Sequence, residues 1–332
     1  MEDELAKVYG PAAVDRSVPK DAQYARGIVL LFVAAALWSL NGALIKLVNR
    51  HEVHGVTIAF WRSLFAGLFL MPLAWGRWHT LRAPLRARDG KAARAAPHWG
   101  ILVSVVVFAL MTTSFVVAST KTEAANAIIL QYTSTFWIFG LSPLVTGEHP
   151  SLKDIPFLLA AMAGIGIIFV DNAATDLLGL VIALGAGFFY GLLVLMLRRV
   201  RDCDPGVITV MNNLGTALLL LVPAMMVGKW LPPIPALALL IGMGAIQLGL
   251  PYYLFSKGLA HVPAHEAALI TMVEPILVPV WAYLAVGETV SKSTIAGGAV
   301  ILAALVAFLL FKRRAENGRT TFDQGRGKGT PS

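Results

Sequence analysis

A carboxylate and two prolines interrupt a long apolar segment near the carboxyl end of the chain. Residues 271–288 read TMVEPILVPVWAYLAVGE and contain Glu274, Pro275 and Pro279. A carboxylate among apolar residues can bind a proton or a cationic group, and a proline removes a backbone donor, so a helix can bend there. The segment therefore predicts Glu274 as a proton-coupling residue, with Pro275 and Pro279 as hinges. The alternatives are a neutral carboxyl hydrogen-bonded between helices and prolines that have no hinge role.

A second ionisable residue, Arg62, lies inside another apolar segment, about 9 Å from its start at the helical rise per residue. A guanidinium there can hold a substrate carboxylate or pair with an acidic side chain. The alternative is that the side chain extends to the membrane surface, past Glu52 and His54. Two hypotheses follow: Arg62, with polar groups from residues 123–147 and 206–228, holds a carboxylate of the substrate, and Glu274 binds a proton or a cationic group of the substrate.

Polar and aromatic side chains in other apolar segments complete a candidate site for a small molecule. Residues 209–216, TVMNNLGT, carry four hydrogen-bonding side chains spaced i, i+3, i+4 and i+7. Their shared helix face either joins helices or lines a wet cavity. Small-molecule pockets combine aromatic walls with a few polar groups, although aromatic residues also serve packing. The predicted substrate-binding residues are Arg62, Trp38, Asn41, Gln131, Tyr132, Asn212, Asn213, Gln247, Tyr252 and Trp281.

Sequence motifs for other chemistry are absent from the chain. Residues 51–54, HEVH, are one residue short of a zinc-binding H-E-x-x-H motif, so the two histidines miss the one-turn spacing. The sequence contains no Walker A motif and no glycine-rich dinucleotide fingerprint. We therefore expect no metal, no cofactor, no catalytic residue and no enzyme activity.

The composition indicates a membrane protein. Of the 332 residues, 57% are hydrophobic and 14% are charged, and the mean hydropathy is +0.71, whereas soluble domains carry about 25% charged residues. The single cysteine, Cys203, excludes an internal disulfide. The net charge of +8 is explained by Lys and Arg residues in the tails and in the connections between apolar segments, where they set the orientation in the membrane. No nucleic-acid partner is therefore expected.

Apolar runs long enough to span a bilayer recur along the chain, because about 20 helical residues cross the hydrocarbon core. Ten spans are predicted, at residues 27–49, 56–75, 98–118, 123–147, 155–171, 177–197, 206–228, 236–256, 265–287 and 293–311. The two tails and the connections on their side of the membrane carry 21 Lys and Arg residues, and the connections on the other side carry 5. Since cytoplasmic segments are the richer in Lys and Arg, both termini are predicted to lie in the cytoplasm, with the protein in the inner membrane. The tails, 1–26 and 312–332, are assigned no fold.

A weak internal repeat accompanies these spans. A shift of 140 residues aligns residues 126–148 with 266–288, and both segments end in Gly-Glu. The shift also relates the fourth span to the ninth and the fifth to the tenth. Since each half then has an odd number of spans, the second half is inverted across the membrane, as in secondary transporters whose binding site lies between the repeats.

Several of these segments resemble the drug/metabolite transporter superfamily, in its EamA-type branch. The similarity rests on WSLNGALIKL, FWRSLFAG, the doubled Gly-Glu pattern and VEPILVPVWAYLAVGE. It implies an all-α integral membrane protein of ten transmembrane helices, arranged as two inverted five-helix repeats (27–171 and 177–311) around a central cavity. Members typically move small metabolites, amino acids among them, across the bacterial inner membrane, often outward. One departure is Ser134-Thr135 in the first half, where the second has Glu274-Pro275.

We therefore predict a secondary transporter, an exporter of small metabolites such as amino acids, that works by alternating access. The expected partners are a small-molecule substrate and the lipid bilayer, with a monomer as the simplest state. The rivals are a multi-span membrane enzyme acting on a lipid-linked substrate and a sensor or assembly subunit. These residues do not identify the substrate or the coupling ion.

Overall fold

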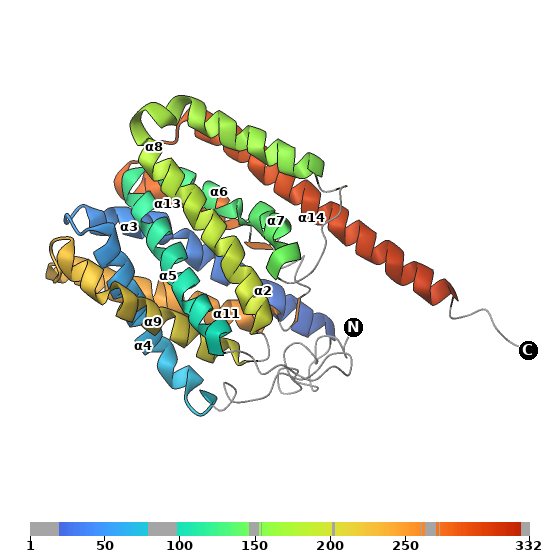
Figure 1. Cartoon of the computed structure of the whole chain (residues 1–332), viewed down its shortest axis with the longest axis horizontal. Coiled ribbons are helices and arrows are strands. Elements are labelled where there is room, and N and C mark those ends of the chain that lie inside the picture. The colour runs from blue at the N-terminus through green and yellow to red at the C-terminus, as the bar shows by residue number, and fades with distance from the viewer. Residues whose placement is uncertain are drawn as a thin grey trace, which may run out of the picture.

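A computed structural model gives the arrangement of the chain (Figure 1). It describes residues 20–78, 98–145, 153, 155–200, 203–259, 261–262, 270–271 and 273–326. Within that part the regular structure is helical and no strand occurs. Helices suit an apolar solvent because every backbone donor and acceptor is paired within the segment.

Six helical stretches are long and apolar enough to cross a membrane: Ala22–Asn49, Gly55–Ala74, Trp99–Lys121, Asp176–Leu197, Pro205–Met226 and Ile234–Phe255. Three shorter apolar helices are Ile155–Phe169, Val273–Val286 and Lys292–Phe308. Many large apolar side chains on these helices are exposed, among them Leu102, Leu218 and Ile234. Such outward-facing side chains suit lipid as the surrounding solvent, and the protein is a multi-pass membrane protein.

The first stretch contains a break between α2 (Lys20–Ser39) and α3 (Asn41–Asn49). At the break the Leu40 amide donates to Leu37 O, three residues back, and Ser39 Oγ donates to Ala36 O at 2.7 Å. Serine hydroxyls that bond the preceding turn in this way favour a local bend. Next to the break, the Trp38 carbonyl accepts from the Gln247 side chain.

A second break corrects the prediction of one continuous helix over residues 123–147. After α4 (Gly55–Ala74) and α5 (His98–Lys121), this region forms α6 (Ala124–Tyr132) and α7 (Ser134–Val145). Both the amide and the hydroxyl of Thr133 donate to Leu130 O, so the turn tightens and the helix is interrupted. Residues 146 and 147 lie outside the described residues.

The following helix, α8 (Ile155–Arg199), contains both the fifth and the sixth predicted spans. Figure 1 shows it as two limbs that meet at a sharp bend. Next, α9 (Pro205–Met226) is capped by Asp204, whose carboxylate accepts from the Gly206 amide at 2.9 Å. The bend in α8 and the capped start of α9 set the directions in which three successive segments cross the bundle.

A π-helical segment lies in the middle of the eighth predicted span. The run consists of α10 (Ile234–Gly242), η4 (Met243–Gly249, the π-helix) and α11 (Leu250–Leu259). Gly244 allows this wide turn to approach α4, since a Cβ there would lie 2.7 Å from Arg62 O. The π-helical turn thus brings Gln247 close to Arg62.

The last two helices are α13 (Val273–Val286) and α14 (Lys292–Arg326). Gly287, with φ +73°, ends α13 in a backbone conformation that favours glycine. The expectation that residues 312–332 have no fold is wrong as far as Arg326, because α14 continues that far and extends beyond the bundle (Figure 1). Residues 312–316, KRRAE, are strong helix formers and no proline interrupts them.

The core lies where α3, α4, α5, α6, α8 and α13 meet, and it includes Ile45, Ile58, Leu130 and Leu180, all fully buried. Glycines allow close contact between α8 and α14. A Cβ on Gly297 of α14 would lie 2.5 Å from Gly164 O on the first limb of α8. These packed helices surround the cavity described next.

Candidate functional site

A small, partly open cavity lies within the bundle and contains both predicted ionisable residues. Its lining comes from α2 through α6, α8, η4, α11 and α13. The lining residues are Trp38, Asn41, Arg62, Phe108, Met111, Thr112, Phe115, Ile128, Gln131, Tyr132, Tyr190, Gln247, Leu248, Tyr252 and Glu274.

Arg62 supplies the positive charge of the cavity and is only 3% exposed. Its Nη1 donates to Asn41 Oδ1 at 2.7 Å, at the start of α3, while Nε has no hydrogen-bond partner. Arg62 forms no ion pair with any residue that the structure describes. A buried guanidinium with an unused donor is suited to an incoming anionic group, because leaving such a group unpaired is costly.

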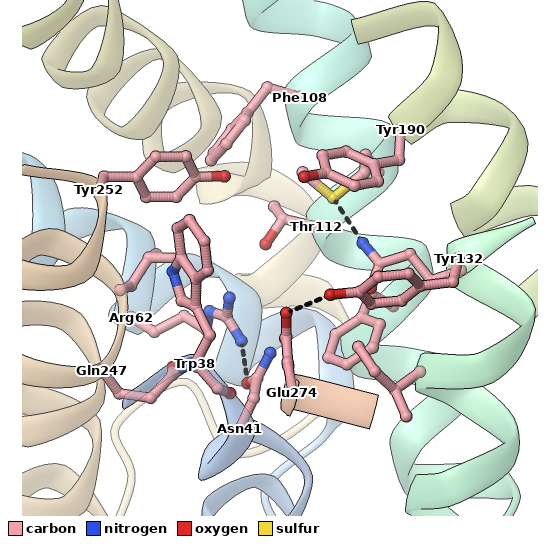
Figure 2. Close-up of a pocket in the computed structure, with 15 residues that line it drawn as sticks. Trp38, Asn41, Arg62, Phe108, Thr112, Tyr132, Tyr190, Gln247, Tyr252 and Glu274 are labelled. Carbon is pink, nitrogen blue, oxygen red and sulfur yellow. Dashed lines mark hydrogen bonds between the residues drawn. The ribbon is translucent and has the colours of Figure 1, made fainter. Parts of the chain in front are cut away.

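Glu274 supplies the negative charge from the first turn of α13 and is partly buried. Its Oε2 accepts a hydrogen bond from the Tyr132 hydroxyl at 3.0 Å. Within the described part of the chain it also has no ion pair, so it is not neutralised by Arg62. Figure 2 shows the Arg62 guanidinium and the Glu274 carboxylate facing the same space from different helices.

Gln247 and Thr112 add uncharged polar groups to the cavity wall. The Gln247 amide donates to Trp38 O at 3.3 Å, next to the break in the first span, while its Oε1 has no partner. Thr112 Oγ1 is likewise buried without a partner. Both can bond a substrate, since each unpaired buried polar atom is costly until it finds a partner.

Aromatic rings form another part of the cavity wall. The Trp38 ring meets the Tyr252 ring edge-to-face with centroids 5.2 Å apart, and Tyr252 in turn contacts Phe108 at 6.3 Å. Tyr190 and Tyr252 both pack against the buried cluster that contains Phe108. Such rigid rings shape a pocket and add dispersion contacts for an apolar portion of a ligand.

Most residues predicted for the site lie together in this cavity. Trp38, Asn41, Arg62, Gln131, Tyr132, Gln247, Tyr252 and Glu274 all line it. Pro275 and Pro279 lie on α13 beyond Glu274 and are not part of the lining.

Three predicted substrate-binding residues do not line the cavity. Asn212 accepts from Ser104 Oγ on α5 at 3.0 Å, and Asn213 donates to Thr209 O within α9. Trp281 Nε1 donates to Ser39 Oγ at 2.9 Å, at the break in the first span. Asn212 thus joins α9 to α5, while the bond of Asn213 stays within α9.

The sequence analysis missed Tyr190 and the α5 wall of the cavity. On α5, Phe108, Met111, Thr112 and Phe115 all line it. Their spacing of three and four residues is a one-face pattern that could have identified them. Tyr190 offered no such signal beyond being the one tyrosine of the sixth predicted span.

Beyond the cavity, one end of the bundle is held by an ion pair. Lys46 Nζ lies 2.7 Å from Glu288 Oε2 and also donates to Thr122 O at 2.7 Å. Glu288 Oε1 accepts from the Ala124 amide at 2.6 Å, at the N-terminus of α6, where a negative charge is favourable. The positive φ of Gly287 turns the chain so that Glu288 follows the end of α13.

Further polar contacts surround this ion pair. Glu123 accepts from the Ser291 amide at 3.1 Å, and Asn126 accepts from Thr294 Oγ1 at 2.7 Å. Partial burial raises the pKa of the Glu123 carboxyl, against the opposing effect of hydrogen bonds from Thr294 and Ser291. These bonds join α6 to α14, so several helices meet at this end through polar groups.

An internal cavity with two charged residues, surrounded by apolar helices, is an arrangement typical of a membrane transporter. The chain belongs to the EamA-like transporter family, whose profile matches residues 25–170 and, a second time, residues 177–310. The resemblance to the drug/metabolite transporter superfamily is thereby confirmed. The chain is a transporter, and the rival hypothesis of a membrane enzyme fails.

Similar proteins agree with this assignment. An uncharacterized transporter of Archaeoglobus fulgidus is 29% identical over 210 residues, which cover 62% of this chain and 74% of the relative. The threonine/homoserine exporter RhtA of Escherichia coli K12 is 26% identical over 182 residues, 52% of this chain and 61% of RhtA. A crystal structure with TM-score 0.60 and 17% identity covers 86% of this chain and 97% of its own, and shares the fold.

Proposed function

We propose that the protein is a secondary transporter that exports small zwitterionic metabolites such as amino acids, by alternating access across the cytoplasmic membrane. The substrate carboxylate binds Arg62, and the substrate ammonium group, or a proton in its place, binds Glu274. The observation that carries the proposal is that these opposite charges line one cavity without pairing with each other.

A zwitterion suits the cavity better than an ion of one sign. An anion alone would leave the Glu274 carboxylate without a positive partner, and a cation alone would leave the Arg62 guanidinium without a negative one. Gln247 and Thr112 offer further hydrogen bonds, and the rings of Trp38 and Tyr252 suit a short apolar side chain. RhtA, a relative over about half of this chain, is a threonine/homoserine exporter, which supports the same class.

The architecture that we propose has ten spans in two inverted repeats, 27–171 and 177–311, flanked by tails at 1–26 and 312–332. The family profile matches the chain twice, and the 140-residue shift relates the two Gly-Glu segments. Both tails lie in the cytoplasm in this arrangement, because the basic residues divide 21 to 5 between the two sides. The Lys46–Glu288 end then faces outward and closes the cavity on that side.

The test is a thermal-shift screen of the purified protein against amino acids, followed by flux of the stabilising compounds in proteoliposomes. Arg62→Ala should lower affinity for a stabilising amino acid about tenfold or more, the effect of losing hydrogen bonds to a charged group. Arg50→Ala is the matched control, since Arg50 lies at the surface and donates to Val286 O away from the cavity. Unchanged affinity in Arg62→Ala, at normal folded yield, refutes the proposed carboxylate site.

A further inference from the structure

The Tyr132 hydroxyl lies between two acceptors on the ninth predicted span. Its oxygen is 3.0 Å from Glu274 Oε2 and 3.0 Å from Thr271 O. A phenol carries one O–H and therefore donates one full hydrogen bond at a time. The two acceptors thus compete for a single proton, and Figure 2 shows the bond to Glu274 in the cavity wall.

The backbone acceptor in this pair lies at a proline break. In a continuous helix Thr271 O would accept from the amide four residues on, but that residue is Pro275, which has no N–H. Backbone carbonyls inside a membrane require donors, and side chains of neighbouring helices commonly supply them at prolines. Tyr132 reaches Thr271 O from α6, of which it is the last residue before the break at Thr133.

The charge on Glu274 decides which acceptor receives the Tyr132 proton. An ionised carboxylate is the stronger acceptor, because hydrogen bonds to charged groups are roughly twice as strong as neutral ones. A neutral carboxyl instead carries its own O–H, which can donate to the Tyr132 oxygen. The Tyr132 proton is then released to Thr271 O. A substrate ammonium group bound to Glu274 also makes the carboxylate a weaker acceptor, so it too favours the hydrogen bond from Tyr132 to Thr271 O.

We propose that Tyr132 is a positioning residue that couples the charge on Glu274 to the proline break of the ninth span, by moving one hydrogen bond between Glu274 and Thr271 O. With Glu274 neutral, Tyr132 fastens the start of this helix to α6. With Glu274 charged, the bond to the backbone is given up and the helix can pivot at Pro275. The inference rests on the proposed function only where it concerns flux; the exchange of the hydrogen bond stands on these contacts alone.

The other ionisable groups near Glu274 lie on other helices. Arg62 on α4, Tyr190 on α8 and Tyr252 on α11 line the same cavity; Arg62 donates to Asn41 on α3, and the Tyr252 ring packs against Trp38. On α3, Lys46 is paired with Glu288 at the end of the bundle. Tyr132 contacts both the Glu274 carboxylate and the Thr271 carbonyl, so a change at Glu274 can reach the backbone through it.

Hydrogen exchange, followed by mass spectrometry over residues 270–286 in detergent, tests the coupling without any substrate. After correction for intrinsic rates, wild-type amides near Pro275 should be about fivefold better protected at low pH than at high pH, the equilibrium effect of one hydrogen bond. Glu274→Gln should keep the protected state at every pH. Tyr132→Phe should lose the pH response, whereas Tyr283→Phe, at an exposed position of α13, should retain it.

A backbone rescue separates coupling from a structural role. Pro275→Ala restores the amide that Thr271 O lacks within the helix, so adding it to Tyr132→Phe should recover the thermal midpoint but not the pH response. A pH response that persists in Tyr132→Phe, or that is absent from the wild type, overturns the inference. If amino acids are transported, Tyr132→Phe should also remove the pH dependence of flux. Failure of all amino acids to bind refutes the proposed function and leaves the exchange result to decide the coupling.

Discussion

Replacing Glu288 with glutamine should loosen the Lys46–Glu288 end of the bundle, which in our proposal closes the cavity. Lys46 lies on α3 five residues beyond Asn41 of the cavity, and Ala124 lies on α6 four residues before Ile128. At the helical rise, the Lys46–Glu288 pair is thus about 6–8 Å beyond the cavity. Glutamine keeps the shape of the side chain and can still accept from the Ala124 amide, so the substitution removes the charge alone.

The size of the effect follows from the burial of the pair. The 2.7 Å ion pair joins side chains that are 18% and 15% exposed. Exposed pairs contribute up to about 1 kcal/mol, and removing one partner of a buried pair costs about 3–5 kcal/mol. We expect about 2 kcal/mol here, with up to about 1 kcal/mol more from the lost charge at the N-terminus of α6. The ratio of open to closed molecules should rise roughly 30- to 150-fold.

Cysteine labelling measures this ratio. The only cysteine, Cys203, is buried, so Cys203→Ser provides a background in which Thr112→Cys places one thiol in the cavity wall. Labelling by a charged maleimide should accelerate in Glu288→Gln and in Lys46→Met, and the double variant should add little to either. Glu52→Gln is the matched control, because Glu52 forms a 2.8 Å ion pair with Lys229 at side-chain exposures of 81% and 55%. Equal labelling in Glu288→Gln and Glu52→Gln would refute the reasoning.

Two other predictions concern stability. The pKa of Glu123 is raised above its ordinary value of 4.5, mainly by burial, so its contribution to stability is fully present below the unfolded pKa and is lost as pH rises through the folded pKa. Thermal unfolding across that range should therefore show a smaller decline with pH in Glu123→Gln than in the wild type; equal slopes contradict the prediction. Gly164→Ala should destabilise the protein by about 1–3 kcal/mol, because its Cβ would lie 2.8 Å from Gly297 O, while Gly166→Ala, with nothing within 4 Å, should not. The two thermal midpoints decide this comparison.

The cavity residues that could be predicted from sequence are those whose polarity conflicts with an apolar segment. Arg62, Glu274 and Gln247 are costly in lipid wherever they lie, so each indicates a protein-lined interior, and each lines the cavity. The argument fails for Asn212, which is equally polar but is satisfied by Ser104 on a neighbouring helix. Polarity identifies a residue that avoids lipid, but it does not distinguish a wet cavity from a helix contact.

Helix boundaries could be predicted where the composition of the sequence changes. Breaks that are caused by hydrogen bonding could not be predicted. The break at Thr133 depends on a hydroxyl that turns back to Leu130 O, and Thr112 on α5 stands in an equally apolar run without interrupting its helix. Similarly, the π-helical turn around Gln247 depends on the close approach of Gly244 to α4. The π-helical turn needs the neighbouring helix in place, and the break at Thr133 depends on where one hydroxyl turns; the apolar pattern of a single segment contains neither.

The two halves of the chain contribute unequally to the cavity, and the inequality gives the proposed coupling its direction. Under the 140-residue shift, Glu274 corresponds to Ser134, and Tyr132 corresponds to Met272. The first half therefore supplies a hydroxyl with one proton, and the second supplies both acceptors and the proline. Had both halves carried a carboxylate and a proline, protonation would act on two helices alike. Here only the second half carries the carboxylate and the proline. In the proposed coupling, a change of charge at Glu274 therefore alters the attachment of α13 while α6 keeps its own backbone bonds, so only one helix of the pair is free to move.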